Sequence, residues 1–294
     1  MTATLENTGS LTSEQLEAYD REGYIVLENF LTGDEMAPAR DAMAQKVSMI
    51  ADELFADGLI PNKFEDEPFK CRLARLFENL TDADFLRYGR GWRDRLPGYF
   101  ILMSHPKILD AVESLIGAEL FSNPVYNVRP KVPKVAAGIV PWHQDKSYWP
   151  DANANPVITV WIPLVDSTHK NGCLHLIPGT HKKRAVKHGT EEYSGTGYLA
   201  LPANYIAERK KEIISLPMKA GSAVLFNDRL IHSSTPNKST HVRWSVDLRY
   251  QPTDQDPMPQ HGIGFLARSQ EHPERVATLE DWLALRPEHP ASDL

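Results

Sequence analysis

The stretch Trp142-His143-Gln144-Asp145 is the part of this sequence that is most informative about the fold. Because alternate side chains of a β-strand point to the same face, a strand here would place His143 and Asp145 together. A third metal ligand must come from another strand, since two ligands on one strand cannot enclose an ion. His232, in Leu230-Ile231-His232-Ser233-Ser234, follows a short apolar run much later in the chain. This layout is expected for a metal held inside a β-barrel.

Two histidines and one carboxylate can hold a metal on one face and leave its other coordination positions open. This arrangement is typical of non-haem Fe(II) oxygenases, which bind oxygen and a co-substrate at the open positions. Arg243 follows His232 across Pro236-Asn237-Lys238-Ser239, so a short β-hairpin would return its guanidinium to the metal. An arginine inside a barrel must be paired, and a carboxylate co-substrate could accept a two-pronged hydrogen bond from it.

The second half of the chain has the pattern of many short strands. Turn clusters such as Lys170-Asn171-Gly172 separate short apolar or alternating runs. These runs occupy residues 120–128, 157–164, 174–177, 223–226 and 242–250. Short strands punctuated by turns are typical of a β-sandwich or barrel. We therefore expect a mainly β protein with flanking helices.

The first half of the chain has helical signals. Thr12-Ser13-Glu14-Gln15 predicts a capping box for a helix that ends at Gly23. A strand is expected at residues 24–27 and a long helix from 33 to about 58. His105-Pro106 precedes a further short helix, which runs through Ile108, Val112 and Ile116 and is closed by Gly117.

These elements predict a single domain over residues 1–294. We expect a flexible tail at residues 1–11 and a β core at residues 118–252, supported by the N-terminal helices. Residues 59–100 show no regular pattern, and we expect them to form a lid or a substrate-binding segment over the site.

Composition narrows the class of protein. The 294 residues are 41% hydrophobic and 24% charged, as in globular proteins. A net charge of −7 argues against a general nucleic-acid-binding role, which needs a basic surface. No signal peptide or membrane-spanning run of ~20 apolar residues is visible. Cys71 and Cys173 form no disulfide framework or zinc motif, so a cytoplasmic protein with two buried thiols is expected.

Further motifs occur in a recognisable order. They are Trp161 in Val160-Trp161-Ile162-Pro163-Leu164, Asn171-Gly172-Cys173-Leu174, Pro178-Gly179-Thr180-His181-Lys182 and the span 221–243. With the metal-binding motifs, they make the chain resemble the phytanoyl-CoA dioxygenase-like family of Fe(II)/2-oxoglutarate oxygenases. The resemblance covers residues 120–250, and residues 24–31 match the family's N-terminal strand. It implies a cupin-type double-stranded β-helix, or jelly roll, that uses Fe(II), 2-oxoglutarate and O2.

The resemblance also implies roles for individual residues. His143, Asp145 and His232 would bind Fe(II), and Arg243 would hold the distal carboxylate of 2-oxoglutarate. Three further positions match residues that contact the co-substrate in relatives: Ser234, Trp161 and Asn127. Tyr126 is an alternative match for the last of these. A simpler interpretation exists for each of the three, respectively a turn cap, a core residue and a backbone-binding amide.

The implied reaction is the oxidation of a C–H bond of a small-molecule metabolite, with release of succinate and CO2. Hydroxylation is favoured because relatives that halogenate lack the carboxylate that Asp145 supplies. Desaturation, ring formation and peroxide chemistry are alternatives that the sequence leaves open. Lys146, Tyr148 and Trp149 directly follow the metal-binding stretch and are expected to contact the substrate. Arg229 and Arg249 are further candidates, with surface exposure as the alternative.

Six arginines lie between residues 72 and 95: Arg72, Arg75, Arg87, Arg90, Arg93 and Arg95. They could recognise an anionic substrate. The simpler interpretation is a solvated face on which they pair with neighbouring acidic residues.

Two other classes of protein also fit parts of the pattern. A metal-dependent cupin isomerase or hydrolase would need the three ligands but not Arg243. A non-catalytic binding protein could retain the fold without using the site. Neither a nucleic acid nor a membrane is expected as a partner, and the sequence gives no prediction of oligomeric state.

Overall fold

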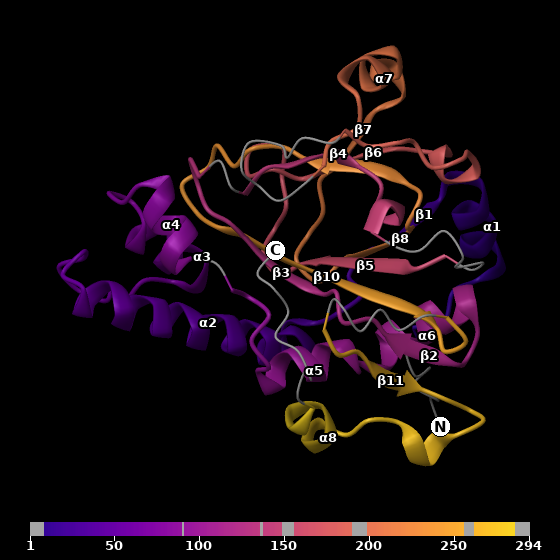
Figure 1. Ribbon diagram of the computed structural model, residues 1–294, viewed down its shortest axis with the longest axis horizontal. Coiled ribbons are helices and arrows are strands. Elements are labelled where there is room, and N and C mark those ends of the chain that lie inside the picture. Colours follow the sequence, from indigo (N-terminus) through magenta and orange to yellow (C-terminus); the bar gives the residue numbers. More distant parts are fainter. Residues whose placement is uncertain are drawn as a thin grey trace, which may run out of the picture.

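The computed structural model describes residues 9–89, 91–135, 138–148, 156–189, 199–255 and 262–285. In this part of the chain, two antiparallel sheets enclose the barrel interior (Figure 1). The larger sheet has the order β1-β8-β5-β10-β2-β11, with β3 also paired to β10, and the smaller has the order β4-β9-β6-β7. The prediction of a mainly β protein with a jelly-roll core and flanking helices is confirmed.

The strands have the following bounds. They are β1 (Tyr24–Leu27), β2 (Leu120–Ser122), β3 (Asn127–Lys131), β4 (Val140–His143), β5 (Ile158–Pro163), β6 (Leu174–Ile177), β7 (Ile214–Leu216), β8 (Ala223–Asn227), β9 (Ile231–Ser234), β10 (Arg243–Pro252) and β11 (Phe265–Arg268).

The helices have the following bounds. They are α1 (Ser13–Glu22), α2 (Gly33–Ala56), α3 (Phe69–Leu76), α4 (Asp82–Tyr88), α5 (Pro97–Met103), α6 (Pro106–Ile116), α7 (Ala203–Glu208) and α8 (Leu279–Ala284).

Strand β10 divides the molecule into an apolar outer side and a polar interior. Its even-numbered residues Trp244, Val246, Leu248 and Tyr250 join the main hydrophobic cluster together with residues of α2, α3, α5 and α6. Trp244 stacks on Phe69 of α3, with 5.1 Å between ring centroids. The odd-numbered residues, beginning at Arg243, point the other way, because successive side chains of a strand alternate. In Figure 1 helices α2 and α5 lie along the outer side of this sheet.

The predicted N-terminal elements are largely confirmed. Helix α1 begins with the expected capping box, in which the Thr12 side chain accepts from the Gln15 N–H and the Gln15 side chain accepts from the Thr12 N–H. The expected strand at residues 24–27 is β1, which pairs with β8. Within the predicted tail, the backbone N–H groups of Gly9 and Leu11 donate to side chains of α6, and the flexibility of the tail stays a prediction. Residues 1–8 lie outside the described part.

The prediction that residues 59–100 are irregular is wrong. This segment contains α3, α4 and the start of α5. The three helices have seven or eight residues, which is too short for a clear 3.6-residue repeat. Their starts were nevertheless marked in the sequence, by Pro68, Pro97 and the capping box of Thr81. Whether the segment acts as a lid stays a prediction.

The larger sheet extends beyond the predicted core of residues 118–252. Strand β1 adds to one edge through β8, and β11 adds to the other through β2. Both additions depend on pairing between segments that are far apart in sequence. Within the described residues, no helix is long and apolar enough to cross a membrane.

Candidate active site

Strands β4 and β9 place two histidines side by side. His143 and His232 are register partners, and their ring centroids lie 4.1 Å apart. The Nδ1 atom of His143 lies 2.9 Å from the carbonyl of Pro141, and that of His232 lies 3.0 Å from the carbonyl of Leu230. Each carbonyl favours a proton on Nδ1 and leaves the Nε2 lone pair for a metal.

Asp145 completes the cluster from a turn. Strand β4 ends at His143, and Asp145 begins a short 3-10 helix (Asp145–Tyr148). The prediction that the first two ligands share a strand is therefore wrong, but the tight turn still directs the carboxylate into the barrel. Its Oδ1 atom lies 3.3 Å from His143 Nε2 and 3.9 Å from His232 Nε2. Ligand atoms of the three residues lie within 4.8 Å of one another, and all three residues are buried.

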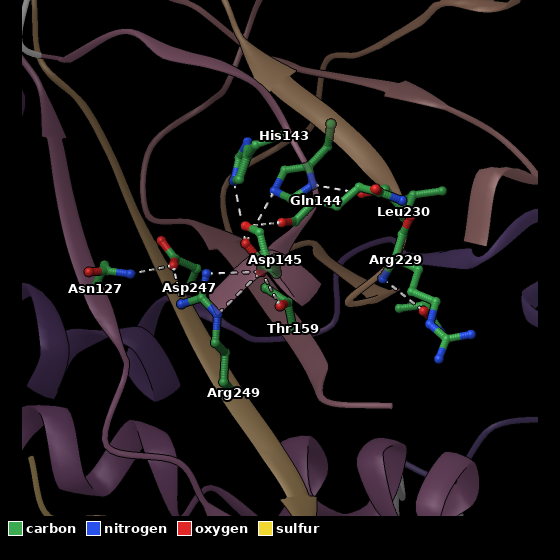
Figure 2. Close-up of polar contacts among 12 residues, drawn as sticks. Asn127, His143, Gln144, Asp145, Thr159, Arg229, Leu230, Asp247 and Arg249 are labelled. Carbon is green, nitrogen blue, oxygen red and sulfur yellow. Dashed lines mark hydrogen bonds and ion pairs between the residues drawn. The ribbon is translucent and has the colours of Figure 1, made fainter. Parts of the chain in front are cut away.

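The two oxygens of Asp145 have different surroundings (Figure 2). Oδ2 accepts hydrogen bonds from Thr159 Oγ1 at 2.8 Å and from Arg249 Nε and Nη2 at 3.2 and 3.0 Å. Oδ1 is buried and accepts no hydrogen bond from the described residues. Oδ1 faces the two histidine Nε2 atoms. This donor set fits a divalent transition metal, with Oδ1 as a single-oxygen ligand.

Electrostatics keep the ligands in their metal-binding forms. Burial alone would raise the pKa of Asp145, but Arg249 and the two histidines lower it well below its usual value. Burial and the neighbouring His143 lower the pKa of His232 to about 3. At neutral pH the site therefore offers a carboxylate and a neutral His232, the forms that bind metals.

A second carboxylate, Asp247, fixes Arg249 in place. It accepts hydrogen bonds from Arg249 Nη1 at 2.6 Å, from Asn127 Nδ2 at 2.7 Å and from Arg129, through both Nε and Nη2. Burial raises the pKa of Asp247, but Arg129 and Arg249 lower it well below its usual value. Asp247 and Asp145 thus hold Arg249 between them (Figure 2).

Two buried cations lie further along strands β3 and β10, which also carry Asn127 and Asp247. Arg243 and Lys131 are register partners on β10 and β3. Arg243 Nη1 donates to Ser245 Oγ at 2.8 Å, its guanidinium lies 5.3 Å from the Trp161 ring centroid, and its Nε has no partner in the described residues. Lys131 Nζ donates to Ser234 Oγ at 2.6 Å and to the Thr235 carbonyl at 2.7 Å.

Neither of these cations forms an ion pair with a described acidic residue. Burial and then Arg129 lower the pKa of Arg243 to about 9. Burial and then Arg243 lower the pKa of Lys131 well below its usual value. Adjacent buried cations without a carboxylate are costly, and an anionic ligand would relieve that cost. One cavity joins this end of the barrel to the metal cluster, and its lining includes Arg243, Trp161, Ser234, His143 and His232.

Asn127 and Tyr126, the two candidates for a contact with the side of the co-substrate, have different hydrogen-bond partners. Asn127 donates to Asp247, a residue that lines the cavity. The hydroxyl of its alternative, Tyr126, instead donates to the carbonyls of Arg93 and Asp94. Asn127 is therefore the residue of this pair that is directed to the site.

The candidate substrate contacts lie beyond Asp145. Lys146 is buried beside Asp228 and is absent from the described lining of the cavity. Its backbone N–H donates to the Asp228 carbonyl at 2.7 Å, and this hydrogen bond fixes the turn that carries Asp145. The side chain of Tyr148 and all of Trp149 lie outside the described part, so their substrate contacts stay predictions.

The residues that support the ligands were not predicted from the sequence. Thr159 and Lys131 were missed, and Arg249 was named only as a candidate substrate contact or a surface residue. A signal that Arg249 faces the interior was present in Arg243-Trp244-Ser245-Val246-Asp247-Leu248-Arg249-Tyr250, where every second residue is polar. Such alternation on a strand predicts one polar face inside the protein when the other face is strongly apolar.

Comparison with known proteins agrees with this geometry. The family model described as phytanoyl-CoA dioxygenase matches residues 19–245. The chain belongs to the phytanoyl-CoA dioxygenase family. It is 29% identical to phytanoyl-CoA dioxygenase of Arabidopsis thaliana over 84% of this chain and 91% of that protein. It is 25% identical to the peroxisomal phytanoyl-CoA dioxygenase of Homo sapiens over 92% of this chain and 76% of that protein.

Solved structures share the fold. One is the non-heme alpha ketoglutarate dependent carbocyclase SnoK from nogalamycin biosynthesis, with a TM-score of 0.55, 21% identity, and coverage of 92% of this chain and 93% of that chain. Another is EctD from S. alaskensis with 2-oxoglutarate and 5-hydroxyectoine, with a TM-score of 0.55, 21% identity, and coverage of 97% of this chain and 87% of that chain.

Family membership and the three-ligand cluster together identify the chain as an Fe(II)/2-oxoglutarate-dependent dioxygenase, an oxidoreductase. The expected cofactors Fe(II), 2-oxoglutarate and O2 are those of this class of enzyme. The comparisons give no support to a cupin isomerase or hydrolase that does not use 2-oxoglutarate, or to a non-catalytic binding protein.

Proposed function

We propose that this dioxygenase hydroxylates a C–H bond of a small-molecule metabolite, with His143, Asp145 and His232 as the iron ligands. The observation that carries the proposal is the buried cluster in which Asp145 Oδ1 faces both histidine Nε2 atoms. Bound Fe(II), together with 2-oxoglutarate and O2, supplies the oxidising chemistry, and succinate and CO2 are released. The protein holds the ligands and shields the site from water.

The carboxylate of Asp145 supports hydroxylation in particular. Its Oδ2 atom is held by Thr159 and Arg249, so Oδ1 keeps one orientation toward the metal. A ligand fixed in this way occupies a coordination position that a halide would otherwise need. The matching positions of halogenating relatives lack this carboxylate, which is why we favour transfer of oxygen.

The co-substrate pocket is proposed at the other end of the cavity. Arg243 would donate to the distal carboxylate of 2-oxoglutarate, since its Nε is buried without a described partner. Ser234 and Lys131 would add a hydroxyl and an ammonium beside it. Trp161 would form the wall under the guanidinium.

Asn127 is proposed as a polar contact at the side of the co-substrate, because its amide already bridges toward the cavity through Asp247. For the substrate we retain Lys146, Tyr148 and Trp149 as proposed contacts, with the burial of Lys146 arguing for a supporting role.

A spectroscopic and a catalytic measurement test the proposal. Anaerobic addition of Fe(II) and 2-oxoglutarate should produce a weak visible charge-transfer band, and oxygen should then release succinate. Asp145→Ala should abolish turnover. His175→Ala is a matched control, because His175 lies on the neighbouring strand β6 and contacts Ser215 outside the cluster. An unchanged rate of succinate release in Asp145→Ala would refute the assignment.

We also propose a cytoplasmic location and no nucleic-acid partner. The support is compositional: the net charge is −7, and Cys71 and Cys173 are both free thiols. Fractionation of cells that express the full chain tests the location. Recovery in an organelle, such as the peroxisome named for a human relative, would contradict it.

A further inference from the structure

Among the described residues, the charges around the cavity do not balance. Five cations converge on the metal and co-substrate sites: Arg93, Arg129, Lys131, Arg243 and Arg249. Among the described residues, the carboxylates that pair with members of this group are Asp145 and Asp247. A divalent metal and a doubly charged 2-oxoglutarate cancel each other. An excess of three positive charges then remains among these residues, or two if Lys131 is neutral.

Most of these cations already have a function. Arg249 holds the metal-binding carboxylate, and Arg129 pairs with Asp247. Arg243 and Lys131 lie at the proposed co-substrate pocket. Arg93 has no such function. Like Arg243 and Lys131 it has no described carboxylate within ion-pair distance, but unlike them its side chain is exposed to solvent.

Arg93 is directed to the site by its contacts. Its Nη2 donates to Asn127 Oδ1 at 3.1 Å. Asn127 in turn donates to Asp247, which binds Arg249, so three residues connect Arg93 to the metal-binding Asp145. Figure 2 shows the inner part of this series of hydrogen bonds, which leads from Asn127 through Asp247 and Arg249 to Asp145.

The neighbouring arginines of the same segment have other partners. Arg75 pairs with Glu78 and Arg87 with Asp57, while Arg72 and Arg95 donate to Ser48 and to the Trp282 carbonyl. Arg90 lies outside the described residues. The simpler interpretation, a solvated face on which arginines pair with acidic residues, therefore holds for Arg75 and Arg87. Arg72 and Arg95 are half-buried and bond to uncharged groups, whereas Arg93 faces the site.

We propose that the substrate carries an oxyanion group, a carboxylate or a phosphate, which Arg93 binds at the open edge of β3. This inference rests on the proposed function, since the charge excess is counted with metal and co-substrate bound. A planar guanidinium suits either oxyanion, because it can donate two parallel hydrogen bonds. In the described part of the chain β3 pairs only with β10, so no other strand covers the edge at which the group would bind.

The test uses holoenzyme loaded anaerobically with Fe(II) and saturating 2-oxoglutarate. It is titrated calorimetrically with octanoate, octyl phosphate and octanamide, and with the corresponding cyclohexyl compounds. The oxyanions should bind about tenfold to a hundredfold more tightly than the amides, as expected for one charge-assisted contact. The order of carboxylate and phosphate shows which oxyanion the site prefers.

Variants locate the effect. Arg93→Gln should remove the preference for oxyanions, and Arg93→Lys should restore part of it. Arg87→Gln, an exposed arginine of the same segment, should bind like the wild type. Equal binding of oxyanion and amide in the wild type, or a preference that survives in Arg93→Gln, would overturn the proposal. A weaker affinity for 2-oxoglutarate in Arg93→Gln would also overturn it, by assigning Arg93 to the co-substrate.

The visible charge-transfer band distinguishes failure of the proposed function from failure of the proposal for Arg93. If no band forms when 2-oxoglutarate is added to the Fe(II) enzyme, the proposed function itself fails. A normal band without oxyanion preference refutes only the assignment of Arg93 and of an acidic substrate.

Discussion

Replacing Arg249 by methionine removes two of the three hydrogen bonds that hold Asp145 Oδ2, at 3.2 and 3.0 Å, and leaves the bond from Thr159. Loss of a residue that orients a metal ligand typically lowers metal affinity by about 10- to 100-fold. This corresponds to roughly 1.4–2.7 kcal/mol. Removal of a positive charge beside the ion acts in the opposite direction, so the sign of the change is informative.

The pKa of Asp145 decides which effect prevails. Burial raises this pKa and Arg249 is the largest influence that lowers it. In Arg249→Met the carboxylate should therefore bind a proton more readily, and the metal must displace that proton. We expect Fe(II) affinity to fall at neutral pH, and the loss to shrink as the pH rises and Asp145 ionises without help.

Anaerobic competition against a chromophoric chelator, at pH 6, 7 and 8, measures this affinity. Arg268→Met is a matched control, because Arg268 pairs with Asp110 and Glu113 of α6, away from the cavity. Thr159→Val should cause a smaller loss, since it removes one hydrogen bond and no charge. An unchanged or higher Fe(II) affinity in Arg249→Met would show that charge repulsion prevails and would refute the orienting role.

Four further predictions concern the co-substrate pocket, the core and one buried acid. Lys131→Met should raise the KM for 2-oxoglutarate about tenfold with little change in kcat, because one buried donor of the pocket is lost; steady-state succinate release measures both. Gly172→Ala should destabilise the fold by about 1–3 kcal/mol in urea unfolding, since φ is +88° and a Cβ would lie 2.3 Å from the Thr235 carbonyl oxygen. Trp244→Ala should cost about 3–5 kcal/mol in the same assay, because the ring is fully buried; a loss below about 1 kcal/mol would contradict its place in the core. Burial raises the pKa of Asp228 to about 6, so the folded state binds more protons than the unfolded state between about pH 4 and 6, and stability should fall as the pH rises through this range. Asp228→Asn should flatten that dependence in urea unfolding at pH 5 and 7, whereas the same slope in the variant would exclude Asp228 as its source.

The sequence was sufficient to find the residues that form the buried three-ligand cluster and the arginine at the other end of the cavity. His143, Asp145, His232 and Arg243 are side chains of distinctive type, and their motifs have a recognisable order. The strands were predicted because their apolar runs are short and separated by turns. The turn at Asp145 was not predicted, since a His-x-Asp spacing fits both a strand and the end of one.

The supporting residues were beyond local reasoning. Thr159 and Arg249 reach Asp145 from strands that follow it by 14 and 104 residues. Lys131 meets Ser234 across 103 residues. No pattern within a short window specifies such meetings, because they depend on the register between strands. The short helices α3 and α4 were missed for a different reason, since each has too few residues to show a helical repeat.

The number of residues in strand β10 is constrained by the two faces that the strand supplies. Its odd positions supply Arg243, Asp247 and Arg249 to the reaction chamber, and its even positions, such as Trp244, anchor the helical layer. Inserting or deleting a single residue near its start would exchange the inward-facing and outward-facing side chains. The guanidinium groups would then point into the hydrophobic core, and the indole of Trp244 would point into the cavity. Evolution can therefore remodel the loops around this enzyme to reach new molecules, but the spacing along this one strand must be inherited unchanged.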